Sequence, residues 1–157
     1  MHYRKQTLAS STPNHKAYNP YMNIFFRYAT GVMGLVFIDQ ITKAFFASRD
    51  FLFGPIKIHL VKNYGMPFNL DFGQAGNLAV VILVFGLFIF YCWQNYKNIN
   101  LAVVVILSGA LSNIVDRIAL GYVRDFINVG LPFTFNLADV FVVGGLISLL
   151  LSKHESR

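Results

Sequence analysis

Four long apolar stretches alternate with shorter polar ones along the chain. They cover residues 23–47, 72–96, 99–120 and 135–152. Each is close to the ~20 residues that a helix needs to cross the hydrocarbon of a bilayer. The pattern therefore predicts an all-α membrane protein with four transmembrane helices that run up, down, up and down.

The connection over residues 48–71 has a different pattern. Apolar Ile56 and Ile58 alternate there with polar Lys57 and His59. Alternation with a period of two is typical of a strand with one apolar face. We expect a small amphipathic β platform that lies at the membrane interface on the outer face.

Small residues indicate where the helices approach one another. Gly31 and Gly34 lie in the first apolar stretch, and Gly144 and Gly145 lie in the last. Because glycine lets two helix backbones come close, we expect both pairs at helix contacts. Cys92 is the only cysteine, so no intrachain disulfide can form, and we expect it to fill space in an apolar run.

The two ends of the chain predict its orientation. Residues 1–22 contain Arg4, Lys5 and Lys16 and no acid, which indicates a flexible basic tail. The tail has no small-residue cleavage site after an apolar core, so we do not read it as a signal peptide. Its positive charge favours a cytoplasmic amino terminus. Four spans then place the carboxyl-terminal tail, residues 153–157, on the cytoplasmic side as well.

Composition supports a membrane protein and narrows the chemistry. The chain is 55% hydrophobic and only 13% charged, whereas soluble domains carry about 25% charged residues. In such a protein a net charge of +6 reflects anionic lipid and orientation, not nucleic acid. The four histidines are scattered, and neither HExxH nor GxSxG occurs, so we expect no metal, no cofactor and no serine nucleophile.

Acidic residues gather at one membrane face in the predicted topology. The end of the first span, the end of the third, the start of the fourth and the 48–71 connection all lie there. Six of the seven acids, every one an Asp, fall in or beside these segments. Ionisable groups within a membrane are costly and mark functional sites, so we expect one polar site at this face.

Helical spacing groups several of these polar residues. Asp39 and Lys43 are four residues apart, so they can pair on one helix face, although such a pair could also simply anchor a helix end. Asn113, Asp116 and Arg117 follow one stripe of the third span. We expect Asp116 to be a structural acid that Arg117 and its other neighbours hold ionised.

Asp125 and Asp139 differ from the other acids because apolar residues flank both. Asn136 shares a helix face with Asp139. Two carboxyls at the edge of a low-dielectric region cannot both ionise cheaply, so one keeps a proton, and such a pair can act as base and acid together, as in aspartic proteases. Two alternatives stay open: each Asp caps a helix or turn, or the chain is a proton or ion relay subunit.

Five motifs together resemble the signature blocks of signal peptidase II, the bacterial lipoprotein signal peptidase. They occur in the family's order and spacing, and the resemblance covers about residues 23–152. The blocks are DQITK (39–43), NYGMPF (63–68), SGALSNIVDR (108–117), GYVRDF (121–126) and FNLAD (135–139).

The resemblance implies an intramembrane aspartyl endopeptidase of the bacterial inner membrane, with its active site toward the outer face. Its substrates would be prolipoproteins, which it would cut just before a diacylglyceryl-modified cysteine. Membrane lipid would surround it. We expect a monomer. Asp125 and Asp139 match the catalytic pair. The residues that match the supporting polar positions are Asp39, Lys43, Asn63, Gly65, Asn113, Arg117 and Asn136.

Four residues depart from the family pattern. Ser108 and Ser112 stand where glycine is usual, and Met66 and Pro67 replace a small pair. Both proposed catalytic acids are intact. A third hypothesis is a catalytically silent homologue, which would bind lipoproteins and leave them intact.

Overall fold

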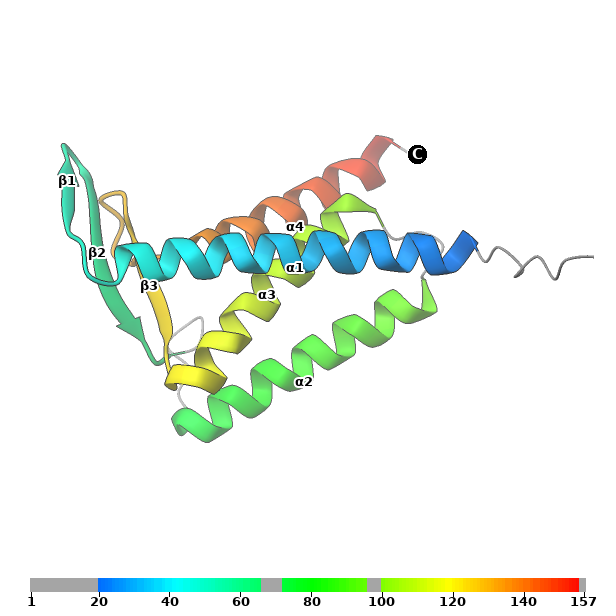
Figure 1. The fold of residues 1–157 in the computed structure, drawn as a ribbon, viewed down its shortest axis with the longest axis horizontal. Coiled ribbons are helices and arrows are strands. Elements are labelled where there is room, and N and C mark those ends of the chain that lie inside the picture. Colours follow the sequence, from blue (N-terminus) through cyan, green and yellow to red (C-terminus); the bar gives the residue numbers. More distant parts are fainter. Residues whose placement is uncertain (1–19, 66–71, 96–99, 156–157) are drawn as a thin grey trace, which may run out of the picture.

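The computed structural model describes residues 20–65, 72–95 and 100–155, and within them the chain forms four helices and a small sheet (Figure 1). This confirms the predicted fold class. The helices are α1 (Pro20–Phe46), α2 (Gly73–Gln94), α3 (Leu101–Leu120) and α4 (Leu137–Glu155), and the strands are β1 (Phe51–Phe53), β2 (Ile56–Asn63) and β3 (Val123–Asn128).

Three of these helices are long and apolar enough to cross a membrane, namely Phe26–Phe46, Gly73–Gln94 and Leu101–Leu120. The apolar part of α4, Leu137–Ser152, is shorter. Large apolar side chains point outward, among them Phe37 at 65% exposure. Because exposing such a large apolar surface to water is unfavourable, these outward faces are the ones that contact lipid. The chain is a membrane protein.

Helix α3 is the centre of the helical part. It packs most extensively on α4, then on α1, and more lightly on α2. Figure 1 shows α1 crossing α3 and α4, with the sheet beyond the carboxyl end of α1. Accordingly, among the described residues α3 has more buried positions than any other helix or strand. The last turn of α1 and the first turn of α4 therefore meet α3 near the sheet.

The sheet is antiparallel, with strand order β1-β2-β3. The predicted platform supplies only β1 and β2, and β3 comes from the segment after α3. Lys62 pairs with Arg124 and Val61 with Asp125, and a register shift separates Val61 from Ile58. The Phe46 ring stacks on that of Phe126 at 4.9 Å between centroids, which joins the end of α1 to β3.

Several predicted segments fall partly or wholly outside the described residues. These are most of the basic tail (1–19), the loop 66–71 that contains Met66 and Pro67, residues 96–99, and residues 156–157. Each helix differs from its predicted span by one to three residues at one end or at both. Helix α1 begins at Pro20, inside the predicted tail, and α4 continues to Glu155, three residues beyond the predicted end of the fourth span.

Two of the four predicted glycines, Gly31 and Gly145, lie at helix contacts, and a Cβ on Gly31 would lie 3.4 Å from the Val104 side chain of α3. A Cβ on Gly145 would lie 2.6 Å from Ile106 and 2.9 Å from the Ala102 carbonyl oxygen, and one on Gly109 would lie 2.3 Å from a backbone oxygen of α4. At Gly34 and Gly144, by contrast, no atom lies within 4 Å of such a Cβ. The prediction was right for Gly31 and Gly145 and wrong for the other two, because the sequence does not say which side of a helix meets a neighbour.

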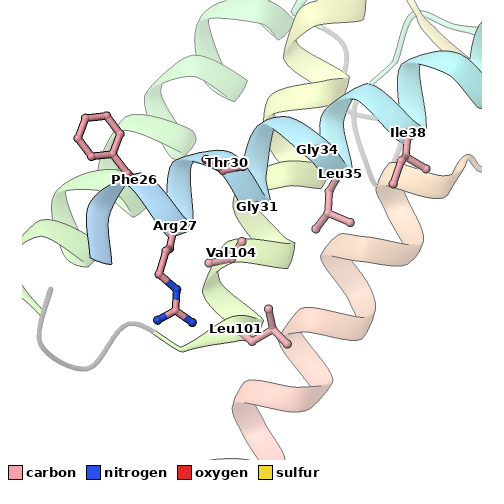
Figure 2. A pocket seen from close by; sticks show the side chains of 9 residues that line it. All are labelled: Phe26, Arg27, Thr30, Gly31, Gly34, Leu35, Ile38, Leu101 and Val104. Carbon is pink, nitrogen blue, oxygen red and sulfur yellow. The ribbon is translucent and has the colours of Figure 1, made fainter. Parts of the chain in front are cut away.

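Two apolar hollows lie beside the helices. One has a volume of about 700 Å³ and runs along α1 beside the start of α3, with Arg27 as its one charged lining residue (Figure 2). The other, of about 440 Å³, lies between α1, α2 and α3. No acidic residue lines either hollow.

The two adjacent glycines of α4 give a matched test of this packing. Gly145→Ala should destabilise the protein by about 1–3 kcal/mol, because the added methyl group overpacks the α3–α4 contact. Gly144→Ala should leave stability unchanged, because its Cβ meets open space. Thermal unfolding in detergent measures both. Equal loss in the two variants would contradict the packing described.

Candidate active site

The predicted polar residues do come together, where α1, α3, β3 and the start of α4 meet. Asp39, Lys43, Asp116 and Asn136 have no exposed surface, and Asp125 is 2% exposed. Asn113, Arg117 and Asp139 are half-buried. Every buried side-chain nitrogen or oxygen of the described residues has a hydrogen-bond partner. We call the four carboxyls Asp39, Asp116, Asp125 and Asp139, with the cations Lys43, Arg117 and Arg124, the carboxylate cluster.

Lys43 lies at the centre of the buried part. Its ammonium group is 2.8 Å from Asp39 Oδ2 and 3.3 Å from Asp116 Oδ2, and it donates to Asn113 Oδ1 at 2.8 Å. An ammonium group has three donors, so all three are used. The predicted pairing of Asp39 with Lys43 is therefore present, but it is part of a larger network rather than a surface anchor.

Asp39 joins three helices. Its Oδ2 also accepts from the Ser112 hydroxyl of α3 at 2.6 Å, and its Oδ1 accepts from the Ala138 backbone N–H at 2.8 Å. Ala138 is in the first turn of α4, where backbone N–H groups lack helical partners and favour a negative charge. Asp39 thus fixes the start of α4 against α1 and α3.

Asp125 lies in β3 and is held by two amides. Its Oδ2 accepts from Asn63 Nδ2 of β2 at 2.8 Å, and its Oδ1 accepts from Asn136 Nδ2 at 2.6 Å. Asn63 also accepts from the Gly65 backbone N–H at 3.0 Å. The carboxyl is therefore oriented from both sides.

Asp139 is held by Asn113 and by the backbone before it. Its Oδ1 accepts from Asn113 Nδ2 at 2.8 Å and its Oδ2 from the Asn136 backbone N–H at 3.0 Å, while Asn136 Oδ1 accepts from the Asp139 N–H. This reciprocal pair of bonds is a capping box at the start of α4. Asp139 thus caps a helix, as one sequence alternative proposed, and also faces the cluster.

Asn136 links the two proposed catalytic carboxyls. Its side-chain amide reaches Asp125 while its backbone N–H reaches Asp139. Burial raises the pKa of Asp125 from 3.8 to about 6, the Asn63 hydrogen bond lowers it, and the Asp139 charge raises it. The Asp139 carboxyl is therefore close enough for its charge to affect Asp125.

Arg117 and Asp116 do not form the predicted pair. Among the described residues, the ion pairs of Asp116 are with Arg124 at 2.7 Å and with Lys43. The Arg117 guanidinium instead donates weakly to the carbonyl oxygens of Gly65 and Asn113, at 3.5 and 3.4 Å, and interacts electrostatically with Asp139, Asp125 and Asp116. Consecutive helical residues point in directions about 100° apart, so the two side chains have different neighbours.

Sequence reasoning missed two members of this network, Gln40 and Arg124. Gln40 donates to Asp116 and Ser112, and Arg124 donates to Asp116 and Gln40. Gln40 follows Asp39 and Arg124 precedes Asp125, so adjacency in sequence to the predicted site acids was the signal that could have identified them.

No group of three or more His, Cys, Asp or Glu within the described residues is arranged to hold a metal ion.

Comparisons with known proteins identify the family of this chain. A family model described as signal peptidase (SPase) II matches residues 32–154. A lipoprotein signal peptidase of Caldicellulosiruptor bescii is 33% identical, with 75% of this chain and 84% of the relative covered. One of Caulobacter vibrioides is 37% identical, with 68% of each chain covered.

A solved structure has a similar fold. It is described as a bacterial membrane enzyme determined by the in meso method at 2.3 Å resolution, and it aligns with a TM-score of 0.69 over 82% of this chain and 88% of that one. Sequence identity is 23%, so this likeness supports the fold alone. A second structure of this description gives a TM-score of 0.68.

Replacing Lys43 tests the central role of its ammonium group. Lys43→Met should lower the free energy of unfolding by about 3–5 kcal/mol, because it leaves two buried carboxylates without their shared cation. Lys57→Ala, at an exposed position of β2, should change stability little. Chemical unfolding in detergent measures both variants. Wild-type stability in the methionine variant would contradict this role.

The raised pKa of Asp125 predicts how stability depends on pH. The folded protein binds this proton more tightly than the unfolded chain, whose carboxyl titrates near 3.8. Its stabilising contribution is full below that value and is lost as the pH rises through about 6. Between pH 7 and pH 5 this group should raise the free energy of unfolding by about 1 kcal/mol.

Unfolding of the wild type and of Asp125→Asn at both pH values measures this contribution. The asparagine cannot titrate, so the variant should lack this part of the pH dependence. The same pH dependence in both proteins would refute the assignment.

Proposed function

The chain belongs to the signal peptidase II family, and from that membership we propose that it is an aspartyl endopeptidase whose catalytic pair is Asp125 and Asp139. It removes signal peptides from prolipoproteins in a bacterial membrane. The cut falls before a cysteine that carries diacylglycerol. No metal or cofactor takes part in the proposed reaction.

The charge balance of the carboxylate cluster carries this proposal. The cluster contains four carboxyls and three cations, Lys43, Arg117 and Arg124. Net charge away from water is expensive, so the cluster is most stable when one carboxyl is protonated. Asp39 and Asp116 are in direct ion pairs, which favour their charged forms. The shared proton therefore resides on Asp125 or Asp139.

A pair with one proton suits peptide hydrolysis. The ionised carboxylate takes a proton from water as that water attacks the scissile carbonyl carbon, and the protonated carboxyl donates to the carbonyl oxygen. As the C–N bond breaks, the proton taken from water passes to the leaving amine. The carboxylate that protonated the carbonyl oxygen takes a proton back from a hydroxyl of the tetrahedral intermediate, and the carbonyl group re-forms. Because the two carboxyls are coupled, the pair titrates as a unit. Asn136 contacts both members and holds them in one arrangement.

The remaining predicted residues support the pair. Asn63 and Asn113 orient one carboxyl each. Lys43 and Arg124 together balance the charges of Asp39 and Asp116. Arg117 compensates the negative charge of the pair and contacts Gly65, which follows β2. These residues position the catalytic carboxyls rather than react.

The sheet is the proposed substrate platform. It lies at the end of the helices where the pair is found (Figure 1). Leu52 and Phe53 of β1 are 70% and 63% exposed, so this strand presents an apolar surface suited to lipid and to a lipidated peptide. We place this end at the outer face of the inner membrane and both termini in the cytoplasm, with the protein as a monomer.

Neutralising either carboxyl tests the catalytic pair. Asp125→Asn and Asp139→Asn should each lower cleavage of a diacylglyceryl-modified prolipoprotein by roughly 10³-fold or more, because each removes one half of the proton transfer. Asp50→Asn, at an exposed position beyond α1, is the matched control and should keep full activity. Electrophoresis of the cleaved signal peptide, with purified protein in detergent, measures all three.

The outcomes separate the competing functions. Full activity in either variant would remove that residue from the mechanism. A wild-type protein that binds the prolipoprotein but never cleaves it would indicate a silent homologue. Ion flux in proteoliposomes that both variants abolish, without any cleavage by the wild type, would favour the relay.

A further inference from the structure

Arg124 directly precedes Asp125, the proposed catalytic acid, in β3. Its backbone and side chain make several hydrogen bonds to Asp116 and Gln40. We propose that Arg124 is a positioning residue for the peptidase reaction, because its attachment to Asp116 and Gln40 fixes β3 and so fixes the Asp125 carboxyl. This inference rests on the proposed role of Asp125. Arg124 itself touches neither carboxyl of the catalytic pair in any contact described above.

Three parts of Arg124 are attached to Asp116. The backbone N–H donates to Asp116 Oδ2 at 3.0 Å, Nε donates to the same oxygen at 3.3 Å, and Nη2 donates to Oδ1 at 2.7 Å. A guanidinium that grips both carboxylate oxygens is a strong and directional contact. The additional backbone bond fixes the strand itself and not only the side chain.

Gln40 extends this attachment to α1. Arg124 Nη2 donates to Gln40 Oε1 at 2.6 Å, and Gln40 Nε2 donates to Asp116 Oδ1 at 3.0 Å and to Ser112 Oγ at 2.9 Å. Ser112 in turn donates to Asp39. Arg124 therefore connects β3 to two helices, and through them to the ion pair of Lys43.

The position of Arg124 in the strand makes this attachment useful. Successive strand residues point to opposite faces, so Arg124 is anchored on one face while Asp125 meets Asn63 and Asn136 on the other. Strand β3 has only six residues, and a slip of one residue would exchange its two faces. The Asp116 contacts hold the Val123–Arg124 peptide, one residue before Asp125, and so prevent such a slip.

The experiment compares Arg124→Gln, Arg124→Lys and Asp116→Asn with the control Arg49→Gln, using purified protein and a diacylglyceryl-modified prolipoprotein. Arg124→Gln should lower kcat by about 10- to 100-fold, because a displacement of about 1 Å in a catalytic group has that effect. KM should change less than about twofold, since substrate contacts are unaltered. Arg124→Lys keeps the charge but not the two-pronged grip, so kcat should recover in part. Arg49 is exposed, and its variant should be fully active.

A coupling measurement tests the pair directly. In the double variant Asp116→Asn with Arg124→Gln, the loss in kcat should be smaller than the product of the two single losses, because both changes remove one contact. Multiplicative losses would overturn the proposal. So would a folded Arg124→Gln or Arg124→Lys with wild-type kcat, or a loss confined to thermal stability or to KM.

Two results distinguish failure of this inference from failure of the proposed function. If Asp125→Asn is inactive and Arg124→Gln is fully active, only the role of Arg124 is wrong. If Asp125→Asn is itself active, the catalytic assignment is wrong. Should Arg124→Gln fail to fold, Arg124→Lys decides, because it retains the buried charge.

Discussion

The structure depends on one buried ammonium group. Lys43 pairs with Asp39 and Asp116, which belong to two different helices, and it also donates to Asn113. Asp39 can accept the backbone N–H of Ala138 without leaving excess negative charge in the interior because Lys43 is beside it. The start of α4, and with it Asp139, is therefore positioned by a charge on α1. In a protein with an apolar exterior, this polar interior provides the specific contacts that lipid-facing residues cannot.

The sequence predicted those features that depend on spacing along one element. Asp39 and Lys43, and Asn136 and Asp139, are within one helical turn, so their pairing followed from geometry. Strand β3 was not predicted, because its partner β2 lies some 60 residues earlier in the chain. For the same reason, the pairing of Asp116 with Arg124 and not with Arg117 could not be predicted. Contacts between segments far apart in the chain produce no periodic pattern of residues in a single sequence.

Asp139 illustrates how a structural and a proposed catalytic role can coexist. Its Oδ2 completes the capping box with Asn136, whereas its Oδ1 faces Asn113. A capped helix start is rigid, and a rigid start holds a carboxyl in one orientation relative to Asp125. Capping and catalysis were alternatives in the sequence, but the cap occupies Oδ2 and leaves Oδ1 toward Asn113. The cap is thus a means of preorganising the proposed base and acid.

The two serines that depart from the family pattern fit this polar interior. Ser108 is fully buried and donates to the Val104 carbonyl one helical turn earlier, at 2.6 Å, so its hydroxyl costs no unsatisfied bond. Ser112 is also fully buried, but its hydroxyl donates to Asp39 and accepts from Gln40. Glycine at this position could do neither. Since Gln40 also accepts from Arg124, Ser112 and Arg124 belong to one hydrogen-bonded path between the Lys43 ion pair and β3. The departure from glycine therefore adds a connection to the site without displacing either carboxyl of the proposed pair.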